Sequence, residues 1–548
     1  MEIIDGYPDF MMESIKKVER TRKSRIGRNL PRMSSDQREV ILSKFHPDYK
    51  EHEKKKLQIG PNKGYRMPLE MISLLEAEPF LDTSKVDLSR VDYDVDVLII
   101  GGGGGGTVAS IWANMSGVPA DRILISTKLR HGDSNSMMAQ GGIQAADGPI
   151  DNPPIHYLDI IGGGHFANKP KLARILAMQA PKIIKWHESL GVMYDKDKEG
   201  NFVERPGGGT SRKRMHSSKD YTGMEILRVV RDESINRKIP VLEFSPAIEL
   251  LKDDMGQVAG AILMNLETNQ YYIVKAKVVI MATGGWGRLH IQNFATTNHY
   301  GATADGLVMA YHVGAKLRDL DSVQYHPTGA AYPEQIVGLL ITEKVRTMGA
   351  QPVNMNGELF VNPLEPRDVE ASAFIRECYE REMGITTPTG MTGVWLDSPM
   401  IDIVQGEGTI HANLDAMYRM FQRFGIDMTK HPMLVFPTLH YQNGGVEINE
   451  HCQTSVKGLF AAGEVTGGVH GKNRLMGNSL LDYNVFGKIA GINVAEYIKN
   501  VKIGKLTLDH VDKYRNILRD ANIKSKVKAP MILPEYREEN LMKRTIKV

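Results

Sequence analysis

The sequence predicts an α/β protein whose nucleotide-binding domain is discontinuous and encloses an insertion. Three observations lead to this prediction. A β-branched run at residues 95–100 is followed directly by six glycines, 101–106, as in the first strand and turn of a βαβ unit. The middle of the chain alternates strand-like with helix-like segments. Near the end, a further strand at 458–462 is followed by a helical stretch at 480–499. Strands at both ends of a long chain indicate one domain built from two segments.

The individual elements follow from local patterns. After the glycines, residues 107–115 favour a helix, and Gly117 suits the left-handed position that ends a helix. Residues 122–126 (RILIS) are typical of a second buried strand. Residues 257–264 and 271–279 alternate in the manner of two hairpin strands.

Composition excludes several classes of protein. Lys plus Arg is 68 and Asp plus Glu is 65, a net charge of +3 that argues against a dedicated nucleic-acid binder. The two cysteines, Cys378 and Cys452, exclude a disulfide scaffold and any iron–sulfur cluster held by this chain alone. No run of about 18 apolar residues and no apolar signal core occurs, so we expect a cytoplasmic protein without a direct membrane span.

The glycine run matches a dinucleotide-binding pattern. Gly101, Gly103 and Gly106 satisfy GxGxxG, in which the glycines permit a tight turn, close approach of backbone to a pyrophosphate, and close helix–strand packing. Its place between a strand and a helix favours cofactor binding over a plain glycine turn. The acidic residue expected about 20 residues later is absent, and residues 126–128 (STK) occupy that place. This argues against an ordinary NAD-dependent dehydrogenase.

Longer motifs follow along the chain. They are IIGGGGGG (99–106), AQGGIQAA (139–146), ATGGWGR (282–288), ADGLVMA (304–310), VQYHPTG (323–329), LLITEKVR (339–346), PRDV (366–369), PTLHYQNGG (437–445) and AAGEVTGGVHGKNRLMGNSLLD (461–482). In this order they resemble the motifs of the succinate dehydrogenase/fumarate reductase flavoprotein family, from about residue 94 to 497. The resemblance implies a Rossmann-like FAD-binding domain, discontinuous, with an inserted α+β capping domain and a short C-terminal helical segment.

With this resemblance we expect five segments. They are an N-terminal extension (1–92), the first part of the FAD-binding domain (93–325), the capping domain (326–437), the second part of the FAD-binding domain (438–500) and a short C-terminal segment (501–548). The extension is basic in patches. It is interpreted either as a docking site for an acidic partner or, preferably, as an arm over its own or a neighbouring subunit.

The resemblance implies FAD as the cofactor, with the glycine turn around its pyrophosphate, two carboxylates on its ribityl or ribose hydroxyls, and backbone against its ring. The cofactor-binding residues so implied are Gly101, Gly103, Gly104, Gly106, Ser126, Lys128, Ser134, Asn135, Ala139, Gln140, Gly141, Gly142, Asp305, Glu464, Asn478, Ser479 and Leu480. No metal site is expected.

One departure from the family concerns the attachment of FAD. Membrane-bound members link the cofactor to a histidine six residues before the first glycine of the GG pair, and here Asn135 stands at that position. His131 lies four residues earlier, and its loop would have to shift for it to reach the flavin. We therefore expect non-covalent FAD, and with it a preference for fumarate reduction over succinate oxidation.

The resemblance also implies the substrate and the acid. His326, Thr342, His440 and Arg474 would clamp a C4 dicarboxylate, since a guanidinium binds a carboxylate bidentately. The proton donor would be Arg367, an improbable acid unless a relay restores its proton. The relay would consist of Glu343 and Arg346, whose i, i+3 spacing places both on one helix face and extends Arg367 toward solvent.

The electrons that reduce the flavin must come from a partner protein or a soluble carrier. In the family, the usual donor is an iron–sulfur subunit of a multi-subunit complex. The thiol-linked fumarate reductases of methanogens are one precedent for such a complex. Three alternatives remain open. They are an L-aspartate oxidase, a reductase of a larger enoate, and a non-catalytic flavin-bearing scaffold. The intact clamp and Arg367 argue against the last two.

Overall fold

A computed structural model describes residues 6–534. Its largest sheet has eight strands in the order β21-β9-β10-β11-β4-β5-β8, with β19 beside β11. β4, β5 and β19 run parallel to their neighbours, whereas β9, β10 and β11 form an antiparallel meander. The bounds are β4 Tyr93–Ile100, β5 Ile123–Ser126, β8 Val241–Leu242, β9 Ala247–Asp253, β10 Val258–Met264, β11 Tyr271–Met281, β19 Leu459–Ala461 and β21 Leu506–Thr507. The predicted α/β class is confirmed, and a strand from the end of the chain joins this sheet.

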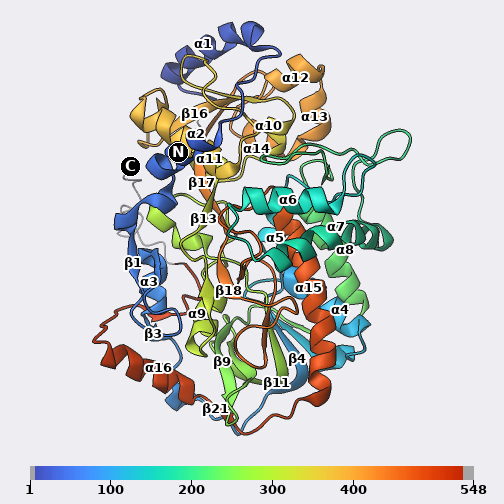
Figure 1. Cartoon of the computed structure of the whole chain (residues 1–548), viewed down its shortest axis with the longest axis vertical. Coiled ribbons are helices and arrows are strands. Elements are labelled where there is room, and N and C mark those ends of the chain that lie inside the picture. Colours follow the sequence, from blue (N-terminus) through green and yellow to red (C-terminus); the bar gives the residue numbers. More distant parts are fainter. Residues whose placement is uncertain (1–5, 535–548) are drawn as a thin grey trace.

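Helices cover this sheet, and two of them cross closely (Figure 1). α4 (Gly104–Met115) begins three residues before the predicted start, because the last glycines of the run already form its first turn. α15 (Asn478–Tyr497) packs on α4, and a Cβ atom at Gly491 would lie 2.4 Å from the Ala109 carbonyl oxygen. The other helices of this part are α5 Asn135–Met138, α6 Pro153–Gly163, α7 Pro170–Leu190, α8 Thr222–Asn236 and α9 Asp305–His312.

A second, antiparallel sheet lies above the first (Figure 1). Its order is β13-β17-β16-β14, and α11 packs on β13. The predicted domain boundaries at 325/326 and 437/438 fall within β13 and β17, so single strands continue across both of them. The bounds are β13 Val323–Ala330, β14 Gln351–Val353, β15 Ile385–Thr386, β16 Thr392–Asp397, β17 Met433–Gln442, α10 Lys344–Thr347, α11 Arg367–Ile375, α12 Met400–Gln405, α13 Thr409–Asn413 and α14 Asp415–Gln422.

The N-terminal extension lies along its own chain, from the upper sheet to the lower part of the molecule (Figure 1). Arg22 and Arg25 both pair with the buried Asp397 of β16, at 2.9 and 2.6 Å. At the other end, the Tyr514 hydroxyl donates to the carbonyl of Leu75. The extension contains α1 Asp9–Arg25, α2 Ser35–Phe45, β1 Lys54–Lys56, β2 Arg66–Pro68, α3 Leu69–Leu75 and β3 Glu78–Pro79.

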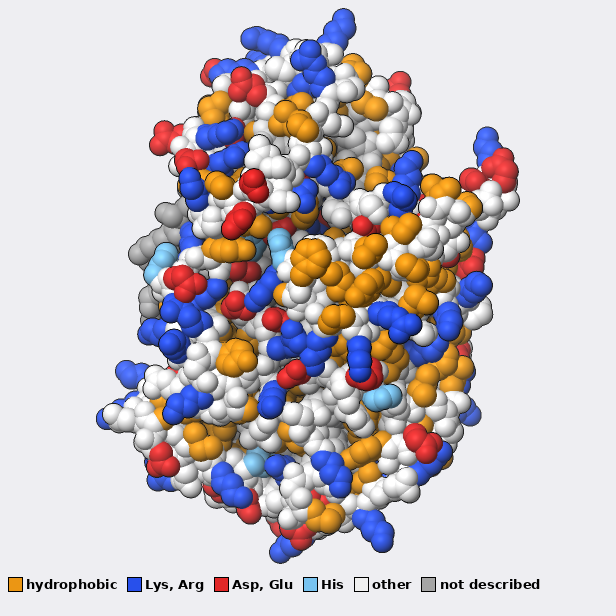
Figure 2. Space-filling model, viewed as in Figure 1, with side chains coloured by type: hydrophobic (Ala, Val, Ile, Leu, Met, Phe, Trp, Pro, Cys, Tyr) orange, Lys and Arg blue, Asp and Glu red, His pale blue; other side chains and the backbone are white. Residues whose placement is uncertain are grey.

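The C-terminal part adds α16 (Asp509–Asp520) and β22 (Lys528–Ala529), which pairs with β3 of the extension. Residues 535–548 of the predicted C-terminal segment lie outside the described residues. Among residues 6–534, none of the helices is both long enough and apolar enough to cross a membrane. Figure 2 shows acidic and basic side chains interspersed, with apolar side chains gathered over the region of α6 and α7.

Candidate active site

A cavity opens at the carboxyl ends of the parallel strands, where α/β sheets usually bind ligands. Four of the predicted cofactor residues, Gly106, Gly141, Gly142 and Asn478, do not line it directly. The other thirteen do: Gly101, Gly103, Gly104, Ser126, Lys128, Ser134, Asn135, Ala139, Gln140, Asp305, Glu464, Ser479 and Leu480.

The glycine turn leaves room that side chains would fill. Gly101 has φ +117°, and a Cβ atom there would lie 2.2 Å from the Ala282 carbonyl oxygen. A Cβ atom on Gly106 would lie 1.9 Å from the Gly101 carbonyl oxygen, so Gly106 serves helix–strand packing, which explains its place behind the cavity wall. Gly103 is the N-cap of α4, whose first N–H groups therefore face the cavity and suit a pyrophosphate.

Polar groups in the wall are arranged for a large polar ligand. Asp305 and Lys128 form an ion pair at 2.5 Å. Burial raises the pKa of Glu464 to about 7, against the opposing effect of the Gln442 N–H. Thr283 and Tyr483 line the cavity, and their hydroxyl groups are buried without a hydrogen-bond partner among the described residues. Unsatisfied buried polar groups are costly, so these two residues and the glycine cradle fit FAD.

Asn135 is firmly held in this wall. Its Nδ2 donates to Oδ1 of Asn298 at 2.9 Å and to Oε2 of Glu464 at 3.3 Å, and its Oδ1 accepts the N–H of His299 at 2.6 Å. His131 does not line the cavity; its Nε2 lies 3.0 Å from the Thr107 hydroxyl.

Two predicted substrate ligands lie on neighbouring strands. His326 of β13 and His440 of β17 have ring centroids 5.1 Å apart. Burial, and then the charge of Arg367, hold the pKa of both imidazoles well below the usual range. The His326 Nδ1 accepts the Thr328 N–H, so its Nε2 carries the proton of the neutral ring. Nδ1 of His440 lies 2.7 Å from the Thr297 hydroxyl. Both histidines are therefore neutral, and Nε2 of His326 can donate a hydrogen bond.

Two arginines converge beside the histidines. Nη1 of Arg367 and Nη2 of Arg474 donate to the same oxygen, Oε1 of Gln324, at 3.0 and 2.9 Å. The Arg474 guanidinium also lies 4.3 Å from the Tyr441 ring centroid. Burial, and then the repulsion of Arg367, lower the pKa of Arg474 to about 9. The pair creates a buried field that favours a dianion.

Two of the predicted substrate ligands, His440 and Thr342, lie at or near the cofactor cavity, and His440 lines it directly. A Cβ atom on Gly141 would lie 3.4 Å from Oγ1 of Thr342, and Gly141 follows the cavity residues Ala139 and Gln140. The side chains predicted to bind the substrate therefore adjoin the part of the cavity predicted to hold the flavin ring.

The three residues of the predicted relay lie together, but its outer end differs from expectation. Oε2 of Glu343 accepts from Nε of Arg367 at 2.8 Å and lies 3.4 Å from Nη2 of Arg346. Burial opposes ionisation of Glu343, but the two arginines outweigh it and lower its pKa. Arg346 does not lead to solvent: its side chain is 0% exposed and contacts Glu370 of α11. The extension covers this region, because α2 packs on α11.

Sequence reasoning missed Gln324 and Glu370. Gln324 is two residues before His326 on β13, so alternation along a strand places both on one face. Glu370 is three residues after Arg367 on α11, which places both on one side of that helix. The strand alternation and the helix spacing could therefore have indicated these two residues from the sequence.

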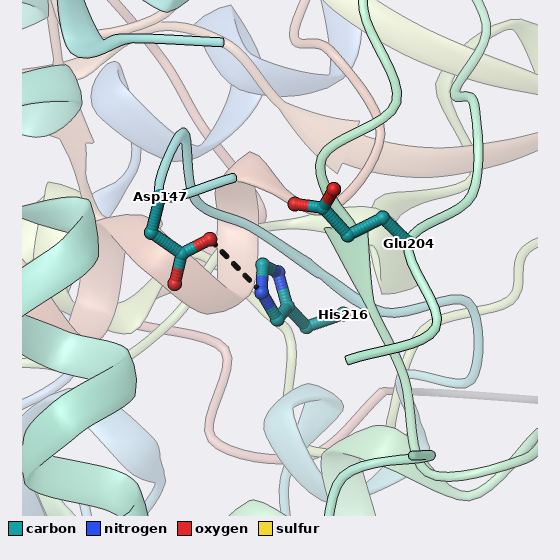
Figure 3. Close-up of side chains that lie close together, drawn as sticks. All are labelled: Asp147, Glu204 and His216. Carbon is teal, nitrogen blue, oxygen red and sulfur yellow. Dashed lines mark ion pairs between the residues drawn. The ribbon is translucent and has the colours of Figure 1, made fainter. Parts of the chain in front are cut away.

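A cluster away from this site has the composition of a metal site. Ligand atoms of Asp147, Glu204 and His216 lie within 4.8 Å of one another (Figure 3). Nε2 of His216 is 3.1 Å from Oδ1 of Asp147, and Asp147 is exposed. A carboxylate that faces a histidine is an ordinary ion pair, so we assign no ligand to this cluster.

Comparison with known proteins defines the class. Residues 96–480 match the FAD binding domain family, so the chain is an FAD-dependent oxidoreductase. A component of the fumarate reductase (CoM/CoB) of Methanothermobacter marburgensis is 36% identical, over 79% of this chain and 78% of that protein. The succinate dehydrogenase flavoprotein subunit of Rickettsia conorii is 33% identical, over 75% and 70%. The solved E. coli quinol fumarate reductase FrdA has a TM-score of 0.70 at 30% identity and covers 79% of this chain and 74% of its own.

The chain therefore belongs to the succinate dehydrogenase/fumarate reductase flavoprotein family, and the resemblance stated from its motifs is confirmed. An L-aspartate oxidase of Nostoc is also 34% identical, over 76% of this chain and 71% of that protein.

Proposed function

We propose that this protein is the flavoprotein subunit of a fumarate reductase that acts on a C4 dicarboxylate. The observation that carries the proposal is the pair of buried arginines joined through Gln324, beside two neutral histidines and next to the cofactor cavity. Two cationic groups and several hydrogen-bond donors suit a ligand with a carboxylate at each end.

Each side chain has a role in this proposal. Arg474 binds one carboxylate, while His326, Thr342 and His440 donate to the other. Withdrawal of charge onto the carboxylates polarises the C=C bond. Arg367 then gives a proton to one carbon of that bond, and the adjacent carboxylate of Glu343 at 2.8 Å passes a proton back to it.

When bound, FAD supplies the hydride that reduces the other carbon. We propose that it is held without a covalent bond, because Asn135 occupies the family's attachment position and is fixed by three hydrogen bonds. The absence of the link favours fumarate reduction as the direction.

Electron supply requires a partner. The chain has two cysteines, Cys378 and Cys452, and both are free and buried, which does not allow a cluster of four ligands. We propose that the donor is an iron–sulfur subunit, supported by the multi-subunit enzymes to which the relatives belong.

The test is an anaerobic assay of the FAD-loaded protein with a reduced viologen dye. Fumarate should oxidise the dye, whereas a longer monocarboxylic enoate should not. L-Aspartate should not reduce the flavin. Rapid flavin reduction by L-aspartate, with no fumarate turnover, would instead identify the aspartate oxidase. Bound FAD that reacts with none of these substrates would identify the non-catalytic scaffold.

A further inference from the structure

The buried relay continues beyond Arg346 into two glutamates. Nη1 of Arg346 donates to Oε2 of Glu370 and, at 2.7 Å, to the carbonyl of Pro363. The Glu370 side chain is fully buried, and its Oε1 has no hydrogen-bond partner among the described residues. Burial raises the pKa of Glu370 well above its usual value against the effect of Arg346, and Glu343 and Glu365 raise it further. Glu370 can therefore hold a proton.

Glu365 connects this buried group to the N-terminal extension. Its side chain is also fully buried, and Nη2 of Arg38 donates to its Oε2 at 3.0 Å. The N–H of Met33 donates to its Oε1. Arg38 belongs to α2 of the extension, and its side chain is 32% exposed. No hydrogen bond joins Glu365 to Glu370 among the described residues, so a water molecule between the two carboxyl groups is needed for the row of charged groups to reach solvent at Arg38.

We propose that Glu370 and Glu365 carry protons from an entrance at Arg38 to Arg346, so that the N-terminal extension completes the proton supply of the active site. The proposal rests on the proposed function. In the polar interior, a glutamic acid can pass a proton directly or through one water molecule.

The transfers balance over one turnover. Arg367 gives a proton to carbon, and Arg346 restores it through Glu343. Glu370 gives its proton to Arg346 and receives one from Glu365, which takes one from water at Arg38. Along this row one proton enters from water and one is delivered to carbon. The hydride comes from the reduced cofactor, and its replacement takes two electrons from the dye and a second proton from solvent.

A second exposed group near the site does not join this row. Nε2 of His165 lies 2.6 Å from Oδ2 of Asp368, next to Arg367 in sequence. Asp368 otherwise accepts the Val369 N–H. Within residues 6–534, no hydrogen bond joins His165 or Asp368 to Arg367, Glu343 or Arg346, whereas Glu370 contacts Arg346 directly. We therefore place the entrance on the Glu370 side, at Arg38.

The experiment compares Glu370→Gln and Glu365→Gln with wild type, using FAD-loaded protein and reduced dye. Arg22→Ala is the control, because Arg22 fixes the same extension to Asp397 at a distance from the relay. We expect kcat for fumarate to fall about tenfold or more in both glutamine variants, with KM and FAD content within about twofold of wild type. The solvent deuterium isotope effect on kcat should increase, because proton delivery becomes rate-limiting. Arg22→Ala should keep the wild-type kcat.

Glu365→Ala provides a second test. Added formate should restore part of its kcat, because a small acid can replace the lost carboxyl, whereas a merely structural role would not respond. Unchanged kcat and isotope effect in folded glutamine variants, or a loss of kcat without formate rescue, would overturn the proposal. If the wild-type protein does not reduce fumarate, the proposed function is wrong. Failure of the proposed function is thereby distinguished from failure of the proton route, which is tested only in the variants.

Discussion

Arg367 and Arg474 share one hydrogen-bond acceptor, Oε1 of Gln324, although both are buried cations. The Glu343 carboxylate compensates Arg367 at 2.8 Å, but no carboxylate pairs with Arg474 among the described residues. The two cations still repel each other, and the burial of Arg474 without an anion is costly. A dicarboxylate would relieve this repulsion, which makes the site selective for charge before any chemistry takes place.

Replacement of Gln324 tests this relationship. In Gln324→Met, similar in size but without the amide, the two guanidinium groups lose their common acceptor and move apart. We expect kcat/KM for fumarate to fall about 10- to 100-fold, as the loss of hydrogen bonds to charged groups implies. Steady-state kinetics check this, with Gln324→Glu as a comparison that should weaken dianion binding. Wild-type kcat/KM in Gln324→Met would contradict the shared-acceptor role.

Arg367→Ala tests the acid. Without the guanidinium, the relay has no group that delivers its proton to the substrate carbon, so we expect turnover to fall by about 10²-fold or more. The cofactor cavity does not include Arg367, and FAD content should stay at the wild-type level. A fumarate assay and the flavin absorbance of the same sample check both. Retention of turnover would refute Arg367 as the acid.

The sequence predicted those parts of the site that lie in continuous motifs. The glycine turn at 101–106 joins one strand to one helix, so its geometry follows from neighbouring residues. His326 and His440 come from motifs far apart, yet each occupies its strand with a family pattern, and adjacent strands then bring them together.

The outer part of the relay could not be predicted in this way. Arg38 and Glu365 are 327 residues apart and belong to no motif, so only the packing of α2 on α11 brings them together. The same packing encloses Arg346, which sequence reasoning had placed on a route to solvent. Charge patches in residues 1–92 indicated an arm but not the partner of each arginine.

Non-covalent attachment of FAD is directly measurable. Asn135 lacks a nucleophilic side chain, and His131 is buried against Thr107. Acid precipitation should therefore release all of the flavin into the supernatant and leave a colourless pellet. Absorbance of both fractions checks this. Yellow colour that stays with the washed pellet would show a covalent bond.

The acid sensitivity of the fold should depend partly on His187. Its Nδ1 lies 2.7 Å from the Tyr194 hydroxyl and its Nε2 lies 2.9 Å from Oδ1 of Asn484, which joins α7 to α15. Burial lowers the pKa of His187 to about 4 from 6.5, although the bond to Asn484 opposes this shift. Between these pH values the unfolded chain binds a proton that the folded chain does not, so stability falls as pH falls.

His187→Gln keeps a polar side chain without this titration. The free energy of unfolding of wild type, relative to the variant, should be constant above about pH 6.5. It should then decrease by about 1.4 kcal/mol per pH unit toward pH 4. Urea titrations of the two FAD-loaded proteins at several pH values check the difference, in which the contributions of all other groups cancel. A constant difference from pH 7 to pH 4 would show that His187 titrates normally in the folded protein. In that case the link between α7 and α15 would not depend on a neutral imidazole.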